Sequence, residues 1–123
     1  MTRIHFAVVF VLLFVSSAWA QQTPAPRACD GVTVVATGGT AVAALSGPVI
    51  GGYIVNPFTA ADQGISTAEG LYIDPTQAAT LSGNGSNTQL QPGQIWYFPP
   101  NTILSKLTVN AASSGHKFTC VRW

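Results

Sequence analysis

Charged side chains are scarce in this chain. Only 7% of its 123 residues are Asp, Glu, Lys or Arg, against about 25% in an average soluble protein. From residue 21 onward, four basic side chains balance four acidic ones. Nucleic-acid binding needs a basic stripe that meets the phosphates, and anionic membranes attract clustered Lys and Arg, so we expect neither partner. Near-zero net charge favours association, which indicates self-association or a protein partner; an ordinary secreted domain with a neutral polar surface is the alternative.

Side chains for nucleophilic catalysis are also few. Residues 21–123 contain a single histidine, His116, in the turn sequence Ser-Ser-Gly-His. A nucleophile needs a base beside it, and the set at hand is His116 with Ser113, Ser114 and, from elsewhere in the chain, Asp74. A histidine among small turn residues is more simply an exposed surface residue. We therefore expect no catalytic residue and no enzymatic activity.

The carboxylates do not predict a site either. Glycoside hydrolysis uses a pair of carboxyl groups, and no spacing among the acidic residues of this chain favours one pair. Asp62 and Glu69 could share a calcium ion with loop carbonyls, although no EF-hand or similar signature accompanies them. We expect no bound metal and no cofactor.

The N-terminus has the layout of a secretory signal peptide. One Arg lies in the first five residues, a run of ten apolar residues follows at 6–15, and Ala18-Trp19-Ala20 forms an A-x-A cleavage site. The run is shorter than the roughly 20 residues that span a bilayer. We expect cleavage before Gln21 and an exported product, periplasmic or extracellular, with a retained N-terminal anchor as the alternative.

The remaining chain of about 100 residues suits one domain. We expect residues 1–20 as the leader, 21–28 as a Pro-broken lead-in, and 29–123 as the folded domain. Cys29 and Cys120 are the only cysteines, and an even pair in an exported protein predicts a disulfide. Free thiols or an intermolecular bridge are the alternatives. Two cysteines so far apart lack the paired spacing of a zinc site.

Short β-branched and aromatic runs, separated by Gly, Pro, Asn and Ser, predict an all-β domain. Turn signals recur every six to twelve residues, the rhythm of a sandwich or barrel. We expect a small β-sandwich, jelly-roll or immunoglobulin-like, and no helix. The expected strands are Val32–Ala36, Ala41–Leu45, Tyr53–Asn56, Leu71–Asp74, Ala78–Leu81, Thr88–Leu90, Ile95–Phe98, Leu104–Ala111 and Lys117–Trp123.

Two stretches echo one another at a spacing of 18 residues. Gly52–Ala61 and Gly70–Ala79 both read Gly, three apolar residues, Asn or Asp, Pro, two variable residues and Ala-Ala. Proline pushes its predecessor out of the helical region, and an Asx side chain can bond the backbone two residues on. The echo predicts a strand, an Asx turn and an Ala-rich second leg, which is architecture rather than chemistry.

Two features are candidates for binding, and a third is a candidate glycosylation site. In Trp96-Tyr97-Phe98 the strand alternation turns Trp96 and Phe98 one way and Tyr97 the other. Exposed aromatic rings can stack on sugar rings or on a partner protein, so Trp96 and Tyr97 are the candidate ligand surface, with core packing of two of the three rings as the alternative. The segment Phe58–Glu69 has few strand formers and is the candidate functional loop. Asn84-Gly85-Ser86 matches a glycosylation sequon, and its Asn-Gly pair also suits a hairpin turn.

Several segments resemble a known class of proteins. NPFTAADQG, LYIDPTQAA, LQPGQIW and VNAASSGHKFTCVRW are similar to stretches of small β-sandwich proteins encoded in tailed-phage and prophage regions. The resemblance implies a virion surface or decoration component that works by assembly and has no catalytic residues. Taken together, we expect a non-enzymatic exported protein that acts through surface contacts, with a carbohydrate-binding or adhesive module as the alternative.

Overall fold

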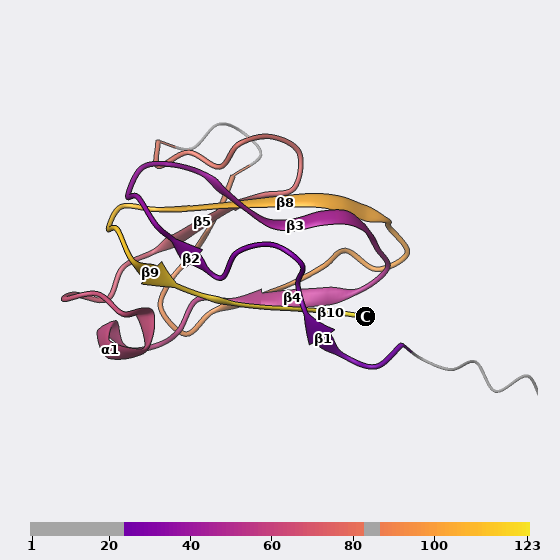
Figure 1. The fold of residues 1–123 in the computed structure, drawn as a ribbon, viewed down its shortest axis with the longest axis horizontal. Helices are drawn as coiled ribbons and strands as arrows, with labels where there is room; N and C mark the ends of the chain where they lie inside the picture. The colour runs from indigo at the N-terminus through magenta and orange to yellow at the C-terminus, as the bar shows by residue number, and fades with distance from the viewer. Residues whose placement is uncertain (1–23, 83–86) are drawn as a thin grey trace, which may run out of the picture.

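Two four-stranded antiparallel sheets packed face to face form the body of the molecule, and the short strands Val34–Val35 and His116–Lys117 form a third sheet of two strands (Figure 1). The structure is a computed structural model that describes residues 24–82 and 87–123. Its strands are β1 (Arg27–Ala28), β2 (Val34–Val35), β3 (Val42–Val49), β4 (Gly52–Val55), β5 (Leu71–Asp74), β6 (Thr88–Leu90), β7 (Ile95–Tyr97), β8 (Leu104–Ala111), β9 (His116–Lys117) and β10 (Thr119–Arg122), with one short helix, α1 (Ala60–Gln63). The expected leader, 1–20, and the sequon, Asn84–Ser86, lie outside the described residues. No helix within the described part of the chain is long and apolar enough to cross a membrane.

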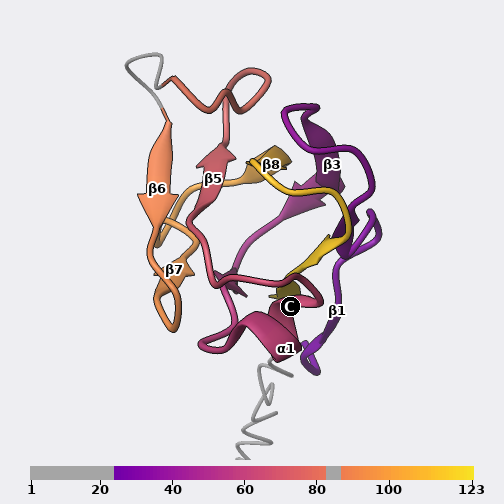
Figure 2. The ribbon, with the colours of Figure 1, turned by 90° about the vertical axis from the view of Figure 1, so that its left-hand side faces the viewer.

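The strand pairs are nested like one long hairpin that has been rolled up. β5 pairs with β6, β4 with β7, β3 with β8, β2 with β9 and β1 with β10, all antiparallel. Rolling places β1-β10-β4-β7 in one sheet, here called the first sheet, and β3-β8-β5-β6 in the second sheet. Figure 2 shows β6 and β7 on the same side of the molecule, where the chain passes between the sheets. This order is that of a jelly roll, the first of the two sandwiches that the sequence predicts.

The core lies between the sheets and is filled by the inward side chains of alternating strand positions. Alternation places Ile54 on the inner side of β4 and Tyr53 on its outer side. The largest apolar side chains that are fully buried are Leu45, Ile54, Leu71, Ile73 and Leu107. Cys29 and Cys120 are joined by a disulfide between buried residues 91 positions apart. The bond links the start of the domain to β10, which is an inner strand between β1 and β4.

The predicted strand Ala78–Leu81 is wrong. This segment instead crosses the outer side of the second sheet, and its backbone bonds to side chains rather than to a neighbouring strand. The Ala79 N–H donates to the Thr108 hydroxyl at 3.0 Å, and the Asn110 amide donates to the Ala79 carbonyl at 2.9 Å. Because Ala79 and Asn110 are both buried, the crossing covers that side of the sheet.

The helix α1 was not expected, although the sequence carries its signal. Thr59 accepts a hydrogen bond from the backbone N–H of Asp62 at 3.1 Å and donates its hydroxyl to the Asp62 carboxylate at 2.6 Å. Gly64 ends the helix in the left-handed conformation, φ 73°. A threonine followed three residues later by an acid, with glycine after the last turn, is the start and stop pattern of a helix.

The two echoes share their first half and differ in the second. Both apolar triplets form strands, within β4 and β5. Asp74 forms the expected Asx turn, because its carboxylate accepts the N–H of Thr76 at 2.8 Å. Asn56 instead extends its side chain across the molecule to other segments. The first Ala-Ala leg is helix α1 and the second is the irregular crossing over the second sheet.

Candidate functional site

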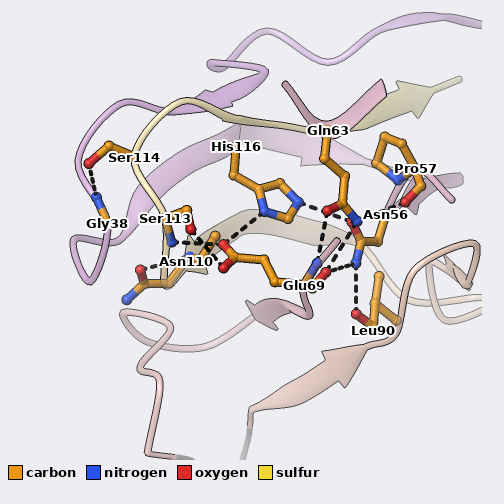
Figure 3. Close-up of polar contacts among 11 residues, drawn as sticks. Gly38, Asn56, Pro57, Gln63, Glu69, Leu90, Asn110, Ser113, Ser114 and His116 are labelled. Atoms are coloured by element: carbon orange, nitrogen blue, oxygen red, sulfur yellow. Dashed lines mark hydrogen bonds and ion pairs between the residues drawn. The ribbon is translucent and has the colours of Figure 1, made fainter. Parts of the chain in front are cut away.

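His116 is fully buried, so the prediction of an exposed turn residue is wrong. It lies in β9, which pairs with β2. Its ring lies between Glu69, whose Oε1 is 3.1 Å from Nδ1, and Asn56, whose Oδ1 is 3.0 Å from Nε2 (Figure 3). These partners come from positions 47 and 60 residues away in the sequence, which is why the local pattern of small residues did not reveal the burial.

The orientation of the Asn56 amide is fixed by its surroundings. Its nitrogen donates to the carbonyls of Glu69 and Leu90 at 2.8 and 2.9 Å. Its oxygen therefore faces His116 and also accepts from the Gln63 side chain at 2.9 Å. Both ring nitrogens of His116 thus face oxygen acceptors, and both contacts are hydrogen bonds when each nitrogen carries a proton.

Glu69 ties the cluster to the turn before β9. Its carboxylate accepts the N–H and the hydroxyl of Ser113 at 2.7 and 2.9 Å. Burial is the largest single influence and raises the pKa of Glu69, but the hydrogen bonds from Ser113 and His116 and the attraction of His116 together outweigh it. The net result is a pKa below the ordinary 4.5. The carboxylate is stabilised in its ionised form by its neighbours.

These contacts hold the chain rather than assemble a nucleophile and a base. The Ser113 hydroxyl bonds Glu69, the Ser114 hydroxyl accepts from the Gly38 N–H at 3.0 Å, and the Asp74 carboxylate bonds Thr76. A serine–histidine pair needs the serine hydroxyl on the imidazole ring, and the two ring nitrogens of His116 instead contact Glu69 and Asn56. The catalytic set considered from the sequence is therefore not arranged as a triad around His116.

Asp62 and Glu69 are engaged by different partners. Asp62 is exposed and bonds Thr59 at the start of α1, whereas the Glu69 carboxylate contacts Ser113 and His116. Within residues 24–82 and 87–123, no group of three or more His, Cys, Asp or Glu side chains is arranged to hold a metal ion. The loop from Asp62 to Glu69 is held at its C-terminal end, because the Gln63 side chain accepts a hydrogen bond from the Glu69 N–H at 2.9 Å.

The outer side of the first sheet carries a second candidate site, which we call the aromatic face. Its residues are the outward positions of three adjacent strands: Tyr53, Val55, Ile95, Tyr97, Thr119, Val121 and Trp123, the last directly after β10. Tyr97 is 65% exposed and Ile95 47% exposed. Tyr53 and Trp123 are half-buried. All these side chains are uncharged.

Three rings cross the aromatic face in a row. Tyr53 is the middle ring, with its centroid 6.0 Å from that of Tyr97 and 6.3 Å from that of Trp123. The planes are tilted by 59° and 58°. Tyr53 and Tyr97 are direct cross-strand partners, and Trp123 rests against Gly51, where a Cβ would lie 2.2 Å from the indole nitrogen. The row is therefore set by strand register and by one glycine.

The structure separates the two residues of the predicted ligand surface. Trp96 is half-buried, contacts the hydrophobic core and lies 5.7 Å from Phe98, ring centre to ring centre, whereas Tyr97 is exposed on the other side of β7. The expected alternation of the three aromatics is confirmed. The residues that accompany Tyr97 are Tyr53 and Trp123, which sequence reasoning missed. Both alternate with inward residues, but only the pairing of β4, β7 and β10 shows that they adjoin.

The two outer faces of the sandwich differ. On the second sheet, the outward positions include polar Thr108 and Asn110, and the crossing at Ala79 covers them. On the first sheet, the outward positions of β4, β7 and β10 are aromatic or aliphatic except for Thr119, and they remain exposed or half-buried. Beside Trp123, a shallow apolar pocket of about 480 Å³ is lined by Pro24, Pro26, Ile50 and Trp123.

Comparison of the chain with protein-family models, with curated proteins and with solved structures finds no match.

Proposed function

We propose that this protein is an exported, non-enzymatic structural or interaction protein that binds through the aromatic face and associates with further copies of itself. The observation that carries the proposal is the row of Tyr97, Tyr53 and Trp123 on the face of the first sheet. An exposed apolar patch on a soluble protein marks an interaction site. Tyr and Trp are also the residues most enriched at the centres of protein interfaces.

Self-association is favoured by the charge balance. Residues 21–123 carry equal numbers of acidic and basic side chains, so two copies have little net repulsion. The aromatic face itself is uncharged, so burying it against a partner leaves no charged side chain without water or an opposite charge. The resemblance to phage-encoded β-sandwich proteins suggests the same mode of action, assembly through surface contacts. Jelly rolls serve in capsid and lectin domains alike, so the fold alone does not choose between them.

The size of the face predicts a weak contact. Three strands about 4.8 Å apart and about four residues long cover roughly 14 by 13 Å, or about 190 Å². A stable dimer of standard size buries about 800 Å² on each partner. We therefore expect a dimer that forms reversibly at high protein concentration rather than a permanent one.

Carbohydrate binding is the second candidate, and the same small area favours it, because a short oligosaccharide would cover the row. The tilts of 59° and 58° argue against a flat sugar platform. A platform that stacks on the flat faces of sugar rings needs coplanar aromatic rings, and this row does not provide them.

Sedimentation velocity over a wide concentration range tests the proposal, with Tyr97→Ser as the variant. Tyr72→Ser is the matched control, because Tyr72 is a half-buried tyrosine on the outer side of the second sheet. We expect wild type and Tyr72→Ser to self-associate and Tyr97→Ser to remain monomeric. Wild type that stays monomeric throughout would contradict self-association. Retention on an insoluble polysaccharide that is lost only in Tyr97→Ser would favour the carbohydrate alternative.

A further inference from the structure

We propose that a proton on Nδ1 of His116 holds the turn of residues 112–115, which joins β8 to β9, against the loop of residues 58–69. The Glu69 carboxylate makes this connection, because it contacts the ring and the turn together (Figure 3). When the ring loses the proton, the carboxylate swings into solvent and releases the turn, so this end of the molecule responds to pH. The inference goes beyond the proposed function and involves no residue of the aromatic face.

Both ring nitrogens of His116 face oxygen atoms that act as acceptors. Nε2 lies 3.0 Å from Oδ1 of Asn56, and the amide nitrogen of Asn56 is occupied by the carbonyls of Glu69 and Leu90. Nδ1 lies 3.1 Å from Oε1 of Glu69. Two hydrogen bonds from Ser113 favour the ionised, acceptor-only form of that carboxylate. A neutral imidazole has one N–H and one bare nitrogen, so it satisfies only one of the two contacts.

The contact with Glu69 is the one that breaks when the ring is neutral. Asn56 is fully buried, and moving its amide would break hydrogen bonds to three other residues. The Glu69 side chain is 20% exposed, so its carboxylate can turn toward water. The neutral ring therefore keeps its proton on Nε2. Its bare Nδ1 then faces an ionised oxygen, and the two acceptors repel one another.

The swing of the carboxylate releases the turn and leaves the loop in place. The N–H and the hydroxyl of Ser113 lose the acceptor that they contact at 2.7 and 2.9 Å. The backbone of Glu69 stays fixed, because its N–H bonds the Gln63 side chain at 2.9 Å and its carbonyl accepts from Asn56 at 2.8 Å. His116 is fully buried, so water reaches Nδ1 through the space that the carboxylate leaves.

Glu69 is the charged side chain that contacts the ring within the described part of the chain. The strand β2 places two valines opposite β9, Lys117 alternates to the other side of β9, and Asp62 of α1 is exposed. Burial raises the pKa of Glu69, but the hydrogen bonds from Ser113 and His116 lower it by more, and it lies below 4.5. The carboxylate therefore stays ionised above about pH 6, and histidine is the group here that changes charge near neutral pH.

NMR of the ring nitrogens tests which proton is lost. The chain has two histidines, His5 and His116, so in His5→Gln the remaining histidine signals belong to His116. We expect both nitrogens to carry protons at the acid end of the titration, about pH 6, and Nδ1 to lose its proton toward about pH 9 while Nε2 keeps its own. Loss from Nε2, or an unchanged ring over this range, overturns the proposal.

Hydrogen exchange of the Ser113 amide tests the release of the turn. Relative to the intrinsic exchange rate at each pH, its protection should fall at least about tenfold as Nδ1 loses its proton. The Glu69 amide is the matched control, because it bonds Gln63 in the same loop and should keep its protection. In Glu69→Gln, where no carboxylate faces the ring, the protection of Ser113 should not change over this range. Equal loss at both amides, no loss at Ser113, or the same loss in Glu69→Gln overturns the proposal.

Discussion

Replacing Glu69 by glutamine tests the role of the buried cluster, which is the hydrogen-bonded group of Asn56, Gln63, Glu69, Ser113 and His116. The carboxylate accepts from three donors, which are the N–H and hydroxyl of Ser113 and the Nδ1 of His116. Glutamine keeps the shape but offers one acceptor oxygen and an NH₂ donor. At least one of the three donors therefore loses its acceptor or faces another donor.

The expected cost follows from burial. Hydrogen bonds to charged groups contribute about 1.5 to 3 kcal/mol each. The His116 side chain is fully buried, but 20% of the Glu69 side chain is exposed, so water replaces part of what is lost. We expect Glu69→Gln to lower the free energy of unfolding at pH 7 by about 2 to 3 kcal/mol.

The pH dependence gives an independent check on this prediction. The pKa of Glu69 lies below 4.5 in the folded protein. A lowered pKa contributes stability that is fully present above the unfolded value and is lost as the pH falls through the folded value. The difference between wild type and Glu69→Gln should therefore be full at pH 7 and shrink well below pH 4.5, where wild type also carries an uncharged side chain.

Urea unfolding of wild type and Glu69→Gln, at pH 7 and again well below pH 4.5, measures the difference in the free energy of unfolding. Asp62→Asn is the control, because Asp62 is an exposed carboxylate in the same loop. Asparagine keeps an oxygen that can accept the Thr59 hydroxyl, so we expect this change at the start of α1 to cost no more than about 1 kcal/mol. The reasoning is refuted if Glu69→Gln costs no more than Asp62→Asn at pH 7. It is also refuted if the cost of Glu69→Gln does not diminish in acid.

Two further predictions concern the disulfide and the glycine beneath the aromatic row. Replacing Cys29 and Cys120 by serine opens a loop of 91 residues and should lower the free energy of unfolding by about 4 to 5 kcal/mol, measured by urea unfolding; a loss under about 1 kcal/mol would contradict the clamp. Gly51→Ala places a methyl group 2.2 Å from the Trp123 indole nitrogen. It should displace the ring, change the tryptophan fluorescence and weaken self-association, at a stability cost of about 1 to 3 kcal/mol; unchanged fluorescence and association would show that the ring position does not matter.

Much of this fold can be predicted from the sequence, because its strands and turns are specified by short local patterns of residues. Strand formers between turn residues correctly locate Leu71–Asp74, Thr88–Leu90 and Leu104–Ala111 to the residue. The failed strand at Ala78–Leu81 shows the limit of such reasoning. Its backbone is satisfied by Thr108 and Asn110, about 30 residues away, and local propensity does not contain that information.

The candidate sites depend even more on contacts between distant segments. The burial of His116 depends on Asn56 and Glu69, which the rolled hairpin brings to it from far along the chain. Alternation places Tyr97 on the opposite side of its strand from Trp96 and Phe98, but it does not show which side is exposed, and the sequence therefore gives both Trp96 and Tyr97 as the candidate ligand surface. The neighbours of Tyr97, which are Tyr53 and Trp123, follow from register, and a slip of one residue would turn each of them to the opposite face. The sequence supplies the side chains of the row, and the topology makes them adjacent.

The buried cluster and the aromatic face share no residue, and this separates stability from binding. Glu69 bonds Ser113 and His116 and fastens the loop that carries α1, whereas Tyr97 is an exposed ring on β7 with little of its surface in the core. Glu69→Gln should therefore lower stability and leave the association of the folded protein unchanged. Tyr97→Ser should do the reverse. A cluster that served binding would couple the two effects, and finding them uncoupled would assign the cluster to the fold and the ring row to the partner.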